Sequence, residues 1–268
     1  MYATYKMSLS DLDRTKLSDY SSAYVGDDLS EKFNELTNKV SQDGFLQMAE
    51  IAEDWFPHAD TRIFISHSHA DEDIACRLAN YLWHEFKIKS FIDSQFWGYS
   101  LDLLKKIDNS YCLNHDGRTY SYELRNQSTS HIHMMLATSL TKMMDKCECF
   151  LFLETDQSRH QKTQEFYTHS VWINYEIHLS SLLRRQLPLR LYPALESAAV
   201  KTHIIEDSQK YIPTEYRIDL SNLKQIGIDS FNDFKSTENY RLIKHNQDFL
   251  PQQALDFLYE NNPFLKSK

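Results

Sequence analysis

Glycine is scarce in this chain of 268 residues, which holds only five glycines. They are far apart in the sequence, at Gly26, Gly44, Gly98, Gly117 and Gly227. No two of them can form a G-x-G-x-x-G turn or a Walker A loop, in which glycines let the backbone approach a phosphate. The two standard nucleotide-binding loops are therefore excluded, and a nucleotide substrate would need another kind of site.

Other shortages narrow the class of protein. Four cysteines are too few for a disulfide framework, so we expect reduced, partly buried thiols. No apolar run approaches the ~18 residues of a membrane-spanning helix, and the start of the chain lacks the apolar core of a signal peptide. The chain has a net charge of −9, whereas nucleic-acid binding needs an excess of basic residues. We expect a cytoplasmic protein with no membrane or nucleic-acid partner.

The first 57 residues have a helical pattern of their own. Apolar residues repeat at helical spacing from Leu29 to Val40 and again from Phe45 to Trp55, with Gly44 between the two segments. Pro57 closes the second segment. The pattern predicts a separate helical extension over residues 1–57, with a role in packing or oligomerisation.

From residue 61 onward, apolar segments of two kinds alternate. Short runs rich in β-favouring residues alternate with longer stretches at helical spacing, and the runs are 62–66, 88–92, 149–153, 187–192 and 216–220. This alternation predicts the α/β class, with a flavodoxin-like parallel sheet and helices on both faces. We expect this domain to span residues 58–225.

Two further segments stand out along the chain. Residues 226–268 predict a helical tail packed on the domain, and Pro251 is suited to open its last helix. The interval from Asp93 to Ser130 is longer than an ordinary connection, which indicates a functional loop or an insertion.

One carboxylate has an unusual setting. Glu176 lies four residues after Trp172 near the start of an expected helix, so the two share a helix face that is largely apolar. This helix follows the carboxyl end of the strand at 149–153, the edge at which open α/β sheets bind ligands. Glu176 is either a functional residue or a surface carboxylate that the helix dipole favours.

Three segments in this order resemble a Toll/interleukin-1 receptor (TIR) domain. They are the strand and loop at 62–68, the strand end Phe91-Ile92-Asp93, and the S-x-W-x-x-x-E segment at 170–176. The resemblance is closest to bacterial antiphage proteins that cleave NAD and make a nucleotide signal. It implies that Glu176 is catalytic and that NAD is a substrate rather than a cofactor. It also implies self-association through TIR surfaces and a downstream effector that senses the product.

The resemblance also implies substrate contacts. The candidates are Ser66, His67, Ser68, Asp93, Phe96, Trp97 and Trp172. The first three would hold a ribose or diphosphate, and Asp93 would bind a ribose hydroxyl or cap a turn. Phe96 and Trp97 would stack on a base or pin their loop to the body or to a neighbouring protomer. Trp172 suits core packing as well as substrate contact. No third ligand accompanies His67 and His69, so we expect no metal site.

A single carboxylate suits NAD cleavage. Nicotinamide is cationic in NAD and leaves as a neutral molecule, so no general acid is needed, whereas most glycosidases use two carboxylates. Glu176 would accept hydrogen bonds from the ribose hydroxyls and stabilise the oxocarbenium-like charge. The product stays open among ADP-ribose and its cyclic or conjugated forms. Two alternatives also remain: a non-enzymatic interaction module, and an enzyme similar to nucleoside deoxyribosyltransferases.

Overall fold

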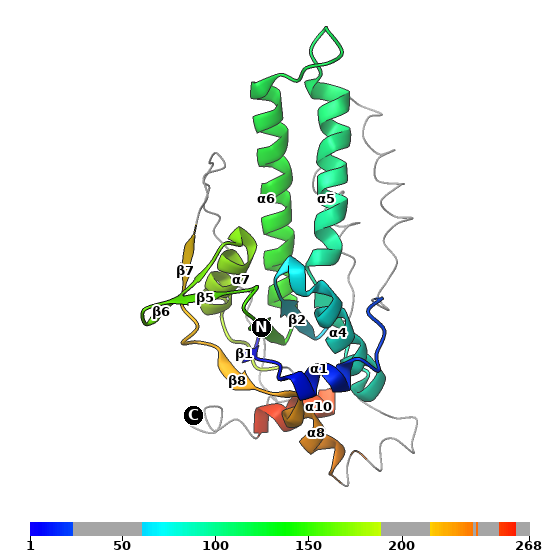
Figure 1. Cartoon of the computed structure of the whole chain (residues 1–268), viewed down its shortest axis with the longest axis vertical. Helices are drawn as coiled ribbons and strands as arrows, with labels where there is room; N and C mark the ends of the chain where they lie inside the picture. The colour runs from blue at the N-terminus through cyan, green and yellow to red at the C-terminus, as the bar shows by residue number, and fades with distance from the viewer. Residues whose placement is uncertain (24–60, 189–214, 238–239, 241–251, 261–268) are drawn as a thin grey trace, which may run out of the picture.

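The centre of the molecule is a five-stranded sheet in the order β3-β2-β4-β1-β8, and every pairing in it is parallel. This computed structural model describes residues 1–23, 61–188, 215–237, 240 and 252–260 (Figure 1). The strands are β1 (Ala3–Met7), β2 (Ile63–Ser66), β3 (Ser90–Ile92), β4 (Cys149–Leu153) and β8 (Lys224–Ile226). The α/β class is confirmed, and the sheet is compatible with a flavodoxin-like fold.

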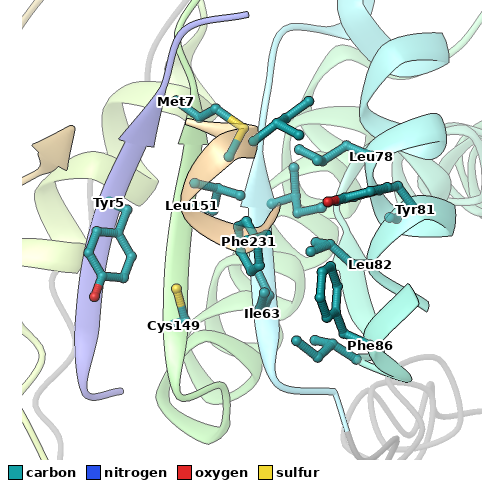
Figure 2. Packing of buried hydrophobic residues seen from close by; sticks show 14 of the residues in the cluster. Tyr5, Met7, Ile63, Leu78, Tyr81, Leu82, Phe86, Cys149, Leu151 and Phe231 are labelled. Carbon is teal, nitrogen blue, oxygen red and sulfur yellow. The ribbon is translucent and has the colours of Figure 1, made fainter. Parts of the chain in front are cut away.

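Helices cover both faces of this sheet, as predicted. Successive side chains of a strand point to opposite faces, so a strand that is apolar throughout needs a covering layer on each side. Cys149, Leu151 and Leu153 of β4 join one core cluster, and Phe150 and Phe152 join the other. The first cluster is completed by α1 (Asp11–Leu17), α4 (Glu72–Phe86), α8 (Ile228–Lys235) and α10 (Gln252–Glu260). Figure 2 shows the side chains of α4 packed against β2 and β4 in this cluster.

The second cluster lies under α5 (Ser94–Ile107), α6 (Tyr122–Lys146) and α7 (Val171–Leu182). Its rings include Phe64 and Phe150, whose centroids are 6.0 Å apart. All four cysteines are free and buried, as expected. Burial raises the pKa of the Cys147 thiol to about 12, which keeps it protonated.

The start of the chain corrects the prediction of a helical extension over residues 1–57. Residues 3–7 form β1, which pairs with β4 over its whole length and with β8 on its other side. Met7 is fully buried and Tyr5 is 2% exposed. The five residues of β1 alternate apolar and polar side chains over too short a stretch to stand out in the sequence, and their central place in the sheet comes from tertiary pairing. The amphipathic segments expected at 29–40 and 45–55 lie outside the described residues.

The two last strands of the prediction also differ from the structure. Residues 216–220 do contain a strand, β7 (Tyr216–Ile218), but it belongs to a separate antiparallel sheet with β5 (His160–Lys162) and β6 (Glu165–Thr168). Of the strand expected at 187–192, residues 187–188 are not in a strand, and the rest lies outside the described residues. In the parallel sheet, β1 pairs with β4 on the side opposite β2.

The long interval after Asp93 is helical rather than a loop. Helix α5 runs into a short π-helix, η2 (Asp108–Cys112), and a turn with Gly117 at φ +63° leads to α6. The two helices lie side by side and extend away from the sheet (Figure 1). Phe96 and Trp97 therefore belong to the first turns of α5, which corrects their placement in a loop. No helix among the described residues is long and apolar enough to cross a membrane.

The C-terminal helices α8 and α10 contribute side chains to the first core cluster. Phe231 and Phe234 of α8 and Leu255 of α10 are buried in the first core cluster. Helix α10 begins at Gln252, directly after Pro251. Because β8 ends at Ile226 and is paired within the sheet, the boundary predicted at residue 226 falls inside a strand.

Candidate functional site

Glu176 lies in the second turn of α7 and points into the protein. The helix begins after Ser170, whose hydroxyl accepts a hydrogen bond from the backbone N–H of Ile173 at 3.2 Å. Glu176 is 0% exposed, which contradicts the alternative of a surface carboxylate. Neither carboxyl oxygen has a hydrogen bond of normal geometry to any part of the chain that the structure describes. A buried carboxyl without such bonds is costly, and this cost is typical of functional positions.

The ends of two neighbouring strands supply the polar side chains around Glu176. Ser66 is the last residue of β2, and Asp93 directly follows β3, which pairs with β2 in parallel. Both are buried, and both act on the charge of Glu176. The three side chains therefore converge at the carboxyl edge of the sheet, where this fold class binds its ligands.

His67 connects the two strand ends. Its Nδ1 atom lies 3.1 Å from Oδ1 of Asp93 and 3.4 Å from the carbonyl oxygen of Ile65. Its Nε2 atom lies 3.0 Å from the hydroxyl oxygen of Ser94, the first residue of α5. Burial lowers the pKa of His67, but the hydrogen bond and charge of Asp93 outweigh burial, and the pKa is raised overall. Asp93 thus favours the imidazolium form of His67.

The acidity of Glu176 is strongly perturbed. Burial raises the pKa of Glu176 well above its ordinary value, and the negative charge of Asp93 raises it further. The Ser66 hydroxyl opposes these effects only in part. Without a ligand, the site therefore favours a neutral Glu176.

The other predicted contacts are Ser68, Trp172, Phe96 and Trp97, and the structure shows the surroundings of the first two. Ser68 caps the short 3₁₀ helix η1 (His69–Asp71), where its hydroxyl accepts from the N–H of Ala70 at 3.3 Å. Trp172 belongs to α7, and its ring is 6.1 Å from that of His133 on α6. This contact supports the packing role of Trp172. Phe96 and Trp97 lie at the start of α5, and their contact with a substrate stays a prediction.

Sequence reasoning did not select Ser94 or a second polar group at the same edge. Glu154, which follows β4, is 7% exposed and accepts from Arg159 at 3.0 Å and from Ser8 at 2.9 Å. The Thr155 hydroxyl donates to Asp71 at 2.5 Å. The position of Glu154 directly after an apolar run was the available signal. These residues already satisfy one another, so the Glu176 group is the stronger candidate site.

The arrangement offers a buried carboxyl, a hydroxyl and a charged pair, but no exposed reactive group. A substrate can touch Glu176 only after the segments around it move, because the carboxyl has no solvent-exposed surface in this conformation. Once reached, it could accept hydrogen bonds from hydroxyl groups or stabilise a nearby positive charge. The chain matches no family model, no curated protein and no solved structure in the three comparisons made.

Proposed function

We propose that this protein is an NAD-cleaving enzyme of the TIR type and that Glu176 is its catalytic residue. The observation that carries the proposal is the convergence of Glu176 with Ser66 and Asp93 at the carboxyl ends of β2 and β3. These three residues come from the three segments that carry the sequence resemblance. The fold class, the edge of the sheet and the perturbed carboxyl are all compatible with that chemistry.

The proposed reaction breaks the bond between the ribose C1′ and the nicotinamide nitrogen. The bonding electrons leave with nicotinamide, which becomes neutral, and positive charge develops on the ribose. In hydrolysis, water attacks C1′, and the products are ADP-ribose, nicotinamide and one proton. Glu176 in its ionised form stabilises the developing charge and accepts hydrogen bonds from the ribose hydroxyls.

The raised pKa of Glu176 is compatible with this role. A cationic nicotinamide ring near a carboxyl favours the ionised form, so substrate binding lowers the pKa that burial and Asp93 had raised. His67 partly neutralises Asp93, at 3.1 Å, and so limits its repulsion of an ionised Glu176. In this proposal Asp93 and His67 are positioning residues, and Ser66 contacts the ribose.

The experiment is to incubate the purified full chain with NAD and to measure nicotinamide release by chromatography. The assay is run over a range of protein concentrations and with a crowding agent, because self-association is part of the proposal. The wild type should release nicotinamide. Glu176→Gln, which keeps the shape of the side chain, should release it at least about 100-fold more slowly. Mass spectrometry of the second product identifies the acceptor that meets the ribose.

The matched control is Glu123→Gln, because Glu123 is an exposed carboxylate at the start of α6. It should cleave NAD at the wild-type rate, and circular dichroism should show that both variants are folded. Equal rates for the wild type and Glu176→Gln would contradict the assigned mechanism. A folded wild type that neither binds nor cleaves NAD under any assembly condition would contradict the function itself.

A second candidate function is a non-enzymatic interaction module. Six large apolar side chains are exposed on the hairpin formed by α5, η2 and α6: Leu101, Tyr111, Leu113, Tyr120, Tyr122 and Leu124. Exposed apolar side chains gathered on one element favour a protein–protein contact. The two functions are distinguished by the same assay, because a module of this kind would associate without releasing nicotinamide.

If the enzyme function holds, the product would be the signal that a downstream antiphage effector senses.

A further inference from the structure

Three side chains of the types that ligate metal ions in proteins meet on the small antiparallel sheet, outside the Glu176 site. They are His160 at the start of β5, His169 directly after β6, and Glu215 directly before β7. One ligand atom from each lies within 4.8 Å of the other two. In the sequence His169 lies 9 positions after His160, and Glu215 lies 46 positions after His169, so no local spacing motif reveals them. The expectation of no metal site was based on His67 and His69 alone.

Strand register explains why the three side chains share a face. His160 pairs with Tyr167 across β5 and β6, and Thr168 pairs with Tyr216 across β6 and β7. Continuing the second register by one residue sets His169 opposite Glu215. Directly opposite residues point to the same face of a sheet, as do residues two apart in one strand. His160, Tyr167, His169 and Glu215 therefore lie on one face by construction.

The contacts among these side chains are already close. Nε2 of His160 is in hydrogen-bonding contact with Oε1 of Glu215, and the His160 and His169 rings are 4.7 Å apart, inclined at 17°. Lys162 donates to the other carboxylate oxygen of Glu215 at 2.6 Å. That bond orients the carboxylate and leaves Oε1 directed at the histidines, as outer hydrogen bonds orient metal-binding carboxylates.

We propose that His160, His169 and Glu215 form a binding site for a divalent transition metal of the zinc class. Two imidazoles and a carboxylate suit zinc and its neighbours, whereas calcium and magnesium prefer ligands that are all oxygen. Tetrahedral zinc with bonds of about 2 Å requires ligand atoms roughly 3.3 Å apart, so the group must contract around the ion. His169 is exposed, which leaves its ring free to turn toward the ion. Three protein ligands leave a fourth position for water.

The position of the site indicates what it would do. His169 immediately precedes Ser170, the N-cap of α7, and α7 carries Glu176. A metal ion would tie the start of β5, the end of β6 and the start of β7 together at the point where α7 begins. The proposed role is structural, and it does not depend on NAD cleavage.

The test uses the full chain, treated with EDTA, freed of chelator and then titrated with zinc chloride in a calorimeter. The expected result is one bound ion per chain, and cobalt in place of zinc should give the visible absorption of a tetrahedral site. His160→Ala and Glu215→Gln should each weaken binding about tenfold or more, because each removes one of only three ligands. Zinc should raise the unfolding temperature of the wild type but not that of these variants.

The control is His178→Ala, which removes an exposed histidine of α7 and should leave both the affinity and the thermal shift unchanged. Glu215→Gln keeps the shape of the side chain, so it tests the site even if His160→Ala does not fold. The absence of saturable binding by the folded wild type would overturn the proposal. So would binding that both variants retain and that alkylation of the cysteines abolishes, since the ligands would then be thiolates.

Discussion

At the scale of single residues, Glu176 is a fully buried carboxyl whose pKa is raised well above its ordinary value. Burial and the adjacent charge of Asp93 both favour its protonated form, so the pKa of Glu176 is higher in the folded state than in the unfolded chain. The folded state therefore holds a proton that the unfolded state releases once the pH exceeds the ordinary pKa. The stability that Glu176 contributes is complete below its ordinary pKa and is lost as the pH rises through its raised pKa.

This linkage predicts how Glu176→Gln changes stability. The variant should be more stable than the wild type at pH 8, by roughly 1–3 kcal/mol, because it removes the ionisation of a buried carboxyl. The difference should shrink toward pH 5, where Glu176 holds its proton more fully. Urea unfolding at both pH values measures it. Glu123→Gln serves as the exposed control, and a Glu176→Gln advantage that is the same at pH 5 and pH 8 would contradict the linkage.

The same residue predicts the pH dependence of the proposed reaction. Nicotinamide release should rise with pH as Glu176 ionises. Asp93→Asn removes the like charge that helps to raise the pKa of Glu176, so its rising limb should move to lower pH. The measurement is kcat/KM for NAD against pH in both proteins. An unshifted profile in a folded Asp93→Asn protein would show that the charge of Asp93 does not act on the catalytic group.

At the scale of elements, the hairpin of α5, η2 and α6 is held by a buried aspartate. Asp108 is 4% exposed and lies in the π-helix η2, where two side chains of α6 contact it. Nε of Arg125 is 2.9 Å from one of its oxygens, and the Ser128 hydroxyl donates to the other at 2.6 Å. The carboxylate thus connects the two helices near the far end of the hairpin.

We expect Asp108→Ala to destabilise the protein by roughly 1–3 kcal/mol, because the buried Ser128 hydroxyl would lose its shortest hydrogen bond and Arg125 would lose its carboxylate partner. Hydrogen exchange should quicken in the hairpin more than in the parallel sheet. Asp102→Ala is the control, since Asp102 is an exposed residue of α5. Equal effects of the two substitutions would mean that the buried contacts of Asp108 do not stabilise the hairpin.

The elements themselves were predictable to different degrees. Residues 149–153 were recognisable as a strand because their apolar run is unbroken, as a strand buried on both faces requires. Residues 94–99 were expected in a loop because the interval after Asp93 is longer than an ordinary connection, yet they begin α5. The packing of Leu103 and Ile107 into the second core cluster favours the helix. Here tertiary burial outweighed the cost of a glycine inside a helix.

At the scale of the whole molecule, the start of the chain is part of the central sheet. We therefore expect the amides of Ala3–Met7 to exchange with solvent as slowly as those of β4, with which they pair. Hydrogen exchange followed by mass spectrometry tests this prediction, and the amides around the exposed turn at Gly117 provide a fast reference. Fast exchange over residues 3–7 would contradict their pairing with β4 and would favour the separate extension predicted from the sequence.

The sequence by itself determined the α/β class, the three strands β2, β3 and β4, and the placement of Glu176 on a helix after a strand end. Each of these is encoded locally, in runs and periods of a few residues that respond to burial. Only the tertiary structure decided that β1 lies beside β4, that Asp93 and Ser66 act on Glu176, and that His160, His169 and Glu215 meet. These are pairings between segments distant in the chain, and they form because the sheet must bury both faces and complete its hydrogen bonds.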